Sequence, residues 1–259
     1  MMNATAQTVA AIPHALSIEG VGRRFGALHA VRDVTITVAE GERRAILGAN
    51  GAGKTTLFNL VAGDIPPSQG RIVMFGRDVT GLPVQRRVRD GLRRTYQTSL
   101  MFGGLTVRQS LFLAVRGVCG GRMSIARPAS RLAEMAAGER LAERLRLTEV
   151  LDSPCSTLSH GERRQLELAM ALAGEPRLLL LDEPAAGLSP REREMLLKLL
   201  LELPRAITLV MIEHDMDIAL RAVDQVSVMH NGRLVAEGTP REIENDRTVH
   251  DIYMGKHVS

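Results

Sequence analysis

The hydrophobic and polar positions near the start of the chain predict β-strands. Residues 16–21 and 31–38 alternate apolar and polar side chains, as strands with one buried face do, and residues 71–76 predict a third strand. Turn residues separate these segments, so we expect an antiparallel sheet. Residues 178–181 and 207–212 are almost wholly apolar instead, which is typical of parallel strands buried on both faces.

Helical patterns follow these strands. Residues 54–62 predict a helix that ends at Gly63, and residues 105–147 are rich in Leu, Ala, Met and Arg without strand alternation. A loop is expected within that stretch, at residues 117–128. The other predicted helices cover residues 84–91, 162–173 and 191–203, and a last one follows Thr239. Asn231-Gly232 predicts a type I′ turn between two further short strands.

This order of elements predicts an α/β fold with a mostly parallel sheet and helices on both of its faces. An N-terminal antiparallel β-subdomain precedes the core, and an α-helical subdomain is inserted at about residues 98–165. We expect residues 16–255 to form a single domain. Residues 1–15 are then a loose extension, and residues 256–259 are a tail.

Composition excludes some functions. Of 259 residues, 45% are hydrophobic and only 3% aromatic, so the core must be mainly aliphatic. The net charge of +4 comes almost wholly from arginine, because Lys54, Lys198 and Lys256 are the only lysines. Such a general arginine bias does not form a basic stripe, and we expect no nucleic-acid partner.

Cysteine usage and hydropathy indicate the compartment. Cys119 and Cys155 lie far apart, in no disulfide framework and no zinc-ligand spacing, which indicates a reducing compartment. No apolar run approaches the length needed to span a bilayer, and residues 1–16 lack the basic start of a signal peptide. The sequence predicts a cytoplasmic protein that reaches a membrane only through a partner.

A phosphate-binding loop is the clearest chemical motif. Residues 48–55 match the pattern G-x-x-x-x-G-K-S/T, between a predicted strand at residues 43–47 and a predicted helix. Glycines let backbone N–H groups surround an anion, and the helix start adds its positive end. Lys54 supplies a charge for the β- and γ-phosphates, and Thr55 supplies a hydroxyl for Mg²⁺. The motif predicts a P-loop NTPase core; the alternative is a glycine-rich turn that binds nothing.

Two carboxylates end the apolar strand at residues 178–181. Since α/β sheets bind ligands at the carboxyl ends of their strands, we expect Asp182 to hold Mg²⁺ and Glu183 to polarise the attacking water. The alternative is an ordinary polar strand end. His214 follows the predicted strand at residues 207–212 and would lie on the same side by the parallel topology, where it could donate to a γ-phosphate.

Two further features each have a structural alternative. Phe25 follows the first predicted strand, where an aromatic ring could stack on an adenine, although a lone aromatic is more often a core residue. Ser159 and Glu162 form a capping box at the start of a helix, which is sufficient reason for both residue types.

In their order along the chain, these motifs resemble the nucleotide-binding subunit of an ABC transporter. The matching segments are residues 48–55 (Walker A), Gln97 (Q-loop), residues 158–162 (signature), residues 178–183 (Walker B), residues 187–190 (D-loop), His214 (switch histidine) and Phe25 (adenine-stacking aromatic). The resemblance covers about residues 16–255, and the six motifs from Walker A to the switch histidine follow the family's order, which makes it specific.

The resemblance implies ATP and Mg²⁺ as ligands and a second ABC ATPase subunit, identical or related, in a head-to-tail dimer. The implied catalytic residues are Glu183 and His214. The implied ATP-binding residues are Phe25, Gly48, Ala49, Asn50, Gly51, Ala52, Gly53, Lys54, Thr55, Thr56 and Gln97. The implied Mg²⁺ ligands are Thr55, Gln97 and Asp182, and the residues that face the partner's ATP are Ser159, His160, Gly161 and Glu162.

The amino-acid sequences of three segments, residues 94–97, 182–188 and 212–216, resemble those of bacterial branched-chain (hydrophobic) amino acid uptake ATPases. This implies transmembrane permease subunits, an extracytoplasmic substrate-binding protein as an indirect partner, and a peripheral place on the cytoplasmic face of the inner membrane. The alternatives are urea and amide importers, which share much of this sequence, and an export ATPase, which would have the same fold.

The chain departs from the family pattern at three positions. His160 and Glu162 replace a Gly and the Gln of the usual L-S-G-G-Q signature, and Ser189 replaces the Asp of the D-loop. These changes concern communication between two ATP sites rather than ATP binding. Soluble ABC ATPases carry a second set of motifs or a long coiled coil, and GTPases carry Asn-Lys-x-Asp; this sequence has none of these.

Overall fold

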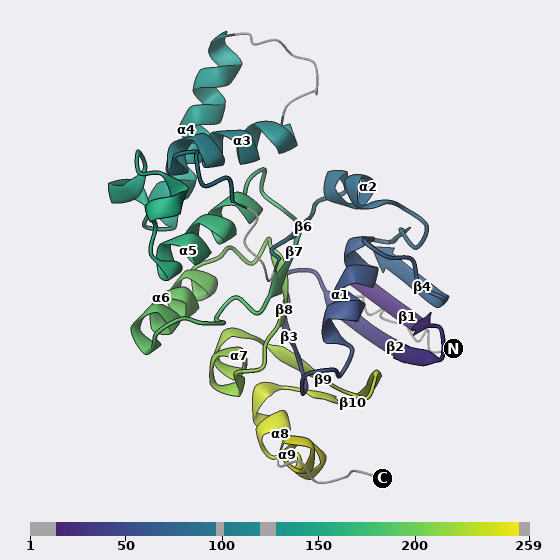
Figure 1. The fold of residues 1–259 in the computed structure, drawn as a ribbon. Helices are drawn as coiled ribbons and strands as arrows, with labels where there is room; N and C mark the ends of the chain where they lie inside the picture. Colours follow the sequence, from purple (N-terminus) through teal and green to yellow (C-terminus); the bar gives the residue numbers. More distant parts are fainter. Residues whose placement is uncertain (1–13, 97–100, 120–127, 254–259) are drawn as a thin grey trace, which may run out of the picture.

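The computed structural model describes residues 14–96, 101–119 and 128–253, and its strands form two sheets (Figure 1). The first sheet is antiparallel, as predicted, with the order β2-β1-β4-β5. Its strands are β1 (His14–Phe25), β2 (Leu28–Ala39), β4 (Gln69–Met74) and β5 (Arg77–Asp78). Bulges in β1, where its pairing with β2 shifts register, bend this strand along its length.

The second sheet has six strands in the order β10-β9-β3-β8-β7-β6, all parallel except β10. They are β3 (Arg43–Leu47), β6 (Leu92–Arg94), β7 (Leu178–Asp182), β8 (Thr208–Ile212), β9 (Gln225–His230) and β10 (Arg233–Gly238). Asn231 and Gly232, which join the last two strands, both have positive φ, as the predicted type I′ turn requires.

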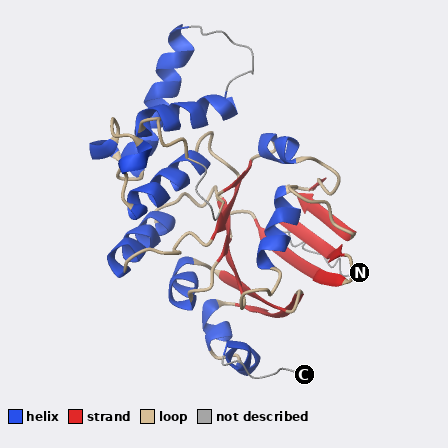
Figure 2. Cartoon of the chain, in the orientation of Figure 1, coloured by secondary structure: helices blue, strands red, loops and turns tan. Residues whose placement is uncertain are grey.

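Helices cover both faces of the second sheet (Figure 2). They are α1 (Lys54–Ala62), α2 (Val84–Arg89), α3 (Val107–Cys119), α4 (Pro128–Arg144), α5 (His160–Ala171), α6 (Pro190–Leu201), α7 (Met216–Ala222), α8 (Pro240–Glu244) and α9 (Arg247–Tyr253). Helix α1 lies between the two sheets. Leu178 and Leu180 face the hydrophobic cluster that contains α1, whereas Leu179 and Leu181 face the cluster on the other side. The all-apolar strand is therefore explained by burial on both faces.

Several boundaries differ from the predicted ones. Helix α5 begins at His160 rather than at residue 162, because Ser159 is its N-cap and the helix starts immediately after the cap. Strand β6 and helix α7 were not predicted from the sequence. Strand β6 has only three residues, two of them arginines, and α7 has only seven residues, so neither carries a periodic pattern long enough to recognise.

A buried arginine supports the far end of α1. The guanidinium of Arg87, on α2, donates to the carbonyl oxygens of Leu60 and Val61 at 2.7 Å each, and also to those of Thr80 and Leu82. The carbonyls at the end of a helix have no partner within the helix, and the helix dipole makes this end negative. Burial lowers the pKa of the Arg87 guanidinium. This lowering occurs although the guanidinium donates to several carbonyl oxygens.

Replacing Arg87 with Leu is expected to lower the free energy of unfolding by about 3 kcal/mol, because several buried carbonyls lose their donor. Arg86, its exposed neighbour on the same helix, is the matched control: Arg86→Leu is expected to change stability by less than about 0.5 kcal/mol. Urea unfolding of the three proteins measures this difference. Equal midpoints for the two variants would contradict the capping role.

Candidate functional site

The loop at residues 48–53 joins β3 to α1 in a backbone conformation that requires glycine. Gly48 and Gly53 have φ of 147° and 99°. A Cβ at Gly48 would lie 2.2 Å from the carbonyl oxygen of Met229, and one at Gly53 would lie 2.4 Å from that of Ala30. Neither backbone neighbour can move far, so side chains are excluded and the loop stays open to a ligand.

Lys54 and Thr55 begin the helix after this loop. The Lys54 ammonium donates to the carbonyl oxygens of Gly48 at 2.6 Å and Ala49 at 3.1 Å, and the residue is only 5% exposed. Burial lowers the pKa of Lys54, while the carboxylates of Glu183, Asp182 and Glu213 oppose that shift. The exposed Thr55 and the half-buried Thr56 line the adjoining cavity.

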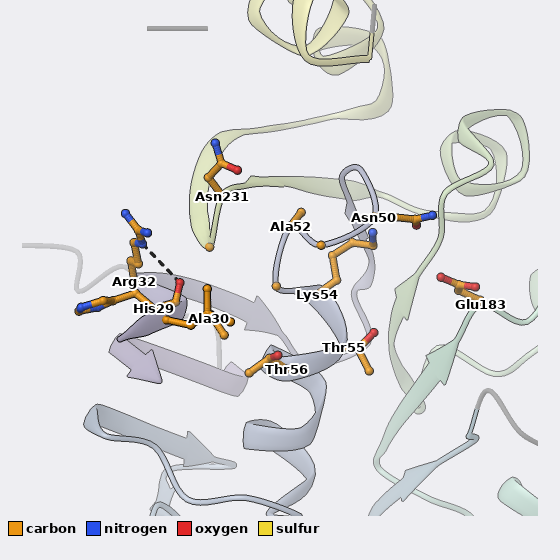
Figure 3. A pocket seen from close by; sticks show the side chains of 14 residues that line it. His29, Ala30, Arg32, Asn50, Ala52, Lys54, Thr55, Thr56, Glu183 and Asn231 are labelled. Carbon is orange, nitrogen blue, oxygen red and sulfur yellow. Dashed lines mark hydrogen bonds between the residues drawn. The ribbon is translucent and has the colours of Figure 1, made fainter. Parts of the chain in front are cut away.

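A cavity of about 470 Å³ lies above the loop, large enough for a nucleotide. In Figure 3, the Lys54 ammonium and the Thr55 hydroxyl point toward the side on which Glu183 lies, while His29 and Arg32 line the opposite side. The lining residues are Leu28, His29, Ala30, Arg32, Asn50, Gly51, Ala52, Gly53, Lys54, Thr55, Thr56, Glu183, Asn231 and Gly232. The cavity thus has a cationic phosphate end and a carboxylate facing it.

Glu183 is held in an unusual backbone conformation at the end of β7. Its φ of 47° lies in the left-handed region, which costs about 1 kcal/mol or more for a residue with a Cβ. Its N–H donates to the carbonyl oxygen of Ile212 at 3.0 Å, which ties it to β8. His214, two residues beyond Ile212, brings its Nδ1 to 3.8 Å from Glu183 Oε2. The parallel topology places these two side chains together, as predicted.

Asp182 lies almost completely buried beside them, at 2% exposure. Its Oδ2 accepts from Arg94 Nη2 at 2.8 Å, whereas its Oδ1 has no partner within the described residues. An unpaired buried carboxylate oxygen and the exposed Thr55 hydroxyl are the hard oxygen donors that Mg²⁺ prefers. No cluster of three or more His, Cys, Asp or Glu that could hold a metal occurs in the part of the chain that the structure describes. A cation here would therefore also need phosphate oxygens or water.

A second buried carboxylate, Glu213, organises the loop that carries Glu183. Its Oε1 accepts from the Ala185 N–H at 2.9 Å, and its Oε2 lies 4.0 Å from His214 Nδ1. Glu213 is completely buried, and this burial raises the pKa of its carboxyl group. Glu213 was not predicted as a site residue, because a glutamate after an apolar strand carries no sequence signal that it will be buried.

The raised pKa of Glu213 predicts a pH-dependent stability. A carboxyl group whose pKa is higher in the folded state stabilises the protein below its unfolded pKa, and this contribution is lost as pH rises through the folded pKa. Glu213→Gln keeps an acceptor for Ala185 and cannot ionise. We therefore expect it to raise the melting temperature relative to wild type at about pH 8, with a smaller difference at about pH 4. Exposed Glu202→Gln is the control, and an equal difference at both pH values would contradict the expectation.

The signature segment does not reach this cavity. Ser159 and Glu162 form the predicted capping box, and none of Ser159, His160, Gly161 and Glu162 lines the cavity. Two of them, His160 and Gly161, contact residues of their own chain on either side of the D-loop segment instead. The ring Nε2 of His160 lies 3.1 Å from the Ala186 carbonyl oxygen, and the Gly161 N–H donates to Glu192 Oε1 at 3.0 Å.

Glu192 joins the starts of two helices. Its Oε2 accepts from the N–H and hydroxyl of Ser189 and so completes a second capping box, while its Oε1 accepts from Gly161. The hydrogen bond from the Ser189 hydroxyl is the largest cause of the lowered pKa of Glu192. Two of the departures from the family pattern, His160 and Ser189, thus lie within one hydrogen-bonded unit of the signature and the D-loop.

Phe25, a predicted ligand residue, is not among the residues that line the cavity. Phe25 is 45% exposed, so the core alternative is wrong; its ring lies under the Arg23 guanidinium, 4.7 Å from the centroid, and does not line the cavity. Its pairing partner Leu28 does line it.

Gln97 lies outside the described residues. Asn231 and Gly232, which the sequence marked only as a turn, lie against the phosphate loop, where the Gly232 N–H donates to the Ala52 carbonyl at 3.0 Å.

Comparisons with known proteins show the family of this chain. The model of the family described as "ABC transporter" matches residues 31–186. The chain is 38% identical to the high-affinity branched-chain amino acid transport ATP-binding protein LivG of Salmonella typhimurium over 251 residues, 93% of this chain and 98% of LivG. It is 36% identical to BraF, a protein of the same description from Pseudomonas aeruginosa, over 93% of this chain and 98% of BraF. A crystal structure of an ATP-binding cassette of an ABC transporter, in its ADP conformation, has a TM-score of 0.82 and 29% identity over 94% of this chain and 99% of its own.

Proposed function

Because the chain belongs to the ABC transporter family and is an ATP-hydrolysing cassette of that family, we propose that it powers the uptake of branched-chain or other hydrophobic amino acids through a membrane transporter. The observation that carries the ATPase part is the cavity itself. A glycine loop with a buried lysine forms one wall, and Glu183 lies across from it (Figure 3). The substrate part rests on the likeness to LivG and BraF.

Each residue of the site then has a chemical task. Lys54 exchanges its carbonyl acceptors for β- and γ-phosphate oxygens, because a charged oxygen is the stronger partner. Asp182, through its unpaired Oδ1, and Thr55, through its hydroxyl, would hold Mg²⁺, with Gln97 as a further ligand. When bound, Mg²⁺ neutralises charge that develops on the phosphates.

Glu183 and His214 act on the water and the γ-phosphate. Glu183 accepts a proton from the attacking water, and its backbone strain is held by the hydrogen bond to Ile212. His214 lies beside it, with a side chain that is more than half exposed and thus accessible to a phosphate. Leu28, the pairing partner of Phe25, lines the cavity, and Phe25 would cover the adenine after a small movement.

The chain alone gives an incomplete site, since its signature residues lie away from its own cavity. We infer a head-to-tail dimer with a second ABC ATPase, in which Ser159 and Gly161 of each chain contact the ATP held by the other. The unit formed by His160, Gly161, Ser189 and Glu192 would then carry a change at one site toward the other.

Attachment to a membrane requires other subunits. No helix in the described part of the chain is long and apolar enough to cross a bilayer. A groove of about 310 Å³ lies between the end of β6 and helices α3 and α5, and its apolar lining includes Tyr96, Met101 and Val118. We propose that a transmembrane permease subunit docks there, on the cytoplasmic face of the membrane, and that a substrate-binding protein acts through that permease.

Dimerisation is tested by the ATPase rate as a function of protein concentration. We expect the rate of the wild type to rise faster than linearly, and Ser159→Arg to abolish this rise, because an arginine at this N-cap would enter the partner's phosphate site. The matched control is Ser156→Arg, which lies in an exposed turn of the same segment. A rate that rises only linearly with the concentration of the wild-type protein would contradict a homodimer. It would favour a related second ATPase, to be identified by co-purification.

The substrate is tested in cells that carry the complete transporter. Replacing the wild-type chain with Glu183→Gln should abolish the uptake of radiolabelled leucine and leave that of urea unchanged. Loss of urea uptake with normal leucine uptake would transfer the assignment to the urea and amide importers. Loss of export of a compound, with both uptakes intact, would make the chain part of an exporter.

A further inference from the structure

We propose that Arg94 is a positioning residue that orients Asp182 for Mg²⁺ and links it to the surface groove beside β6. The inference deepens the proposed function and rests on its assignment of Asp182 as a metal ligand. Arg94 begins the segment at residues 94–97 that resembles the uptake ATPases, but that resemblance gives it no role.

The Arg94 guanidinium joins three elements that meet beside the phosphate loop. Its Nη1 donates to Asn59 Oδ1 on α1 at 2.6 Å and to Asp64 Oδ2 just beyond α1 at 2.8 Å. Its Nη2 donates to Asp182 Oδ2 at the end of β7, also at 2.8 Å. The side chain is only 6% exposed, so water competes little for these bonds.

This arrangement determines which oxygen of Asp182 a cation can use. The planar guanidinium has a fixed geometry, and one of its nitrogens holds Oδ2 while the other holds α1. Oδ1 remains buried and without a partner in the described residues. The Asp182 carboxylate lies near enough to Lys54 to oppose the lowering of the pKa of its ammonium, so it is close to the helix start that follows the phosphate loop.

Thr95, the residue after Arg94, forms hydrogen bonds to the backbone of β7. Thr95 Oγ1 accepts from the Asp182 N–H at 3.2 Å, and the Thr95 N–H donates to the Leu180 carbonyl at 2.9 Å. The dipeptide Arg94-Thr95 therefore contacts both the main chain and the carboxylate at the end of β7. Strand β6 is a three-residue edge strand, so few other bonds keep it in place.

The same residues form the wall of the groove assigned to the permease. Arg94, Thr95 and Tyr96 all line it, and the Tyr96 ring lies 4.9 Å from the Arg94 guanidinium carbon. The Phe58 ring also lies near the guanidinium, with its centroid 5.7 Å from the same carbon. A subunit seated in the groove would thus reach the free oxygen of Asp182 through one side chain.

Charge and position predict opposite effects of removing Arg94. On charge alone, loss of a cation near the metal would strengthen Mg²⁺ binding. If Arg94 acts by positioning, its loss leaves the carboxylate free to turn, and Mg²⁺ binding weakens. Loss of an outer residue that orients a metal ligand typically weakens metal affinity by about 10-fold to 100-fold.

The experiment measures binding of a fluorescent ATP analogue to the full chain, first with EDTA and then with increasing Mg²⁺. For Arg94→Leu, we expect nucleotide affinity in EDTA to remain within about twofold of wild type, because Lys54 and the glycine loop are untouched. The Mg²⁺ concentration at half-effect is expected to rise about 10-fold. Arg94→Lys retains the charge but cannot hold Asn59 and Asp182 with one flat fork, so the Mg²⁺ midpoint should rise there too, by a smaller factor.

Arg87→Leu is the control for a merely structural effect, since it should lower the melting temperature without moving the Mg²⁺ midpoint. A midpoint that is unchanged or lower in both Arg94 variants overturns the inference, and Arg94→Lys alone decides it if Arg94→Leu does not fold. A wild type that shows no Mg²⁺-dependent nucleotide binding would instead overturn the proposed function.

Discussion

Replacing Glu183 with Gln is expected to reduce ATP turnover about 10²-fold to 10³-fold while ATP binding is retained, since this is the usual effect of removing one well-placed catalytic group. Glutamine has nearly the same shape as glutamate, so the strained backbone at this position and its hydrogen bond to Ile212 should persist. What the variant loses is the ability to accept a proton from water.

The measurement compares steady-state phosphate release with the equilibrium binding of ATP. Glu149→Gln, at an exposed turn remote from the cavity, is the matched control and should turn over at the wild-type rate. Near wild-type turnover by Glu183→Gln would remove Glu183 from the role of general base. Loss of ATP binding would mean that the carboxylate holds the site together rather than activating water.

Lys54→Ala is expected to weaken nucleotide binding itself by about 10²-fold, close to 3 kcal/mol. Lys54 is the one lysine among the described residues that line the cavity, and its ammonium is already desolvated, so it can form strong bonds to phosphate without a further cost of burial. Its present bonds to the Gly48 and Ala49 carbonyls also keep the loop in shape. The variant therefore loses both a charge and a support of the loop.

Isothermal titration with ATP and with ADP measures this loss. Lys198→Ala is the control, because Lys198 is exposed on α6 and bears the same charge at a site without a ligand. Unchanged affinity in Lys54→Ala would exclude Lys54 from the phosphate site. An equal loss in both variants would indicate a general effect of net charge.

Local features of the site were predictable because neighbouring residues encode them. The pattern at residues 48–55 contains the glycines that the observed positive φ values require. Ser159 and Glu162 predict the start of α5 through their own two hydrogen bonds. The apolar runs predict strands buried on both faces, and parallel strands place their carboxyl ends at one edge, so Asp182, Glu183 and His214 could be expected together.

Contacts between distant segments were not predictable. Arg94 and Asp182 lie 88 residues apart, and their bond depends on β6 pairing with β7 in one register. The turn at Asn231 and Gly232 lies on the phosphate loop only because β9 pairs with β3. The same holds for the Glu192 bond to Gly161 and the Glu213 bond to Ala185.

Short-range pattern in the sequence thus predicts the class of chemistry: a phosphate loop, a carboxylate expected to bind a metal and a carboxylate expected to activate water. Which charged side chains surround them depends on the tertiary structure, because strand order and register are set by packing over the whole molecule. A hydrophobic pattern specifies which face of a strand is buried, but it does not specify the neighbour against which that face packs. The hydrogen bonds of Arg94 to Asp182, of Gly161 to Glu192 and of Ala185 to Glu213 depend on packing for that reason.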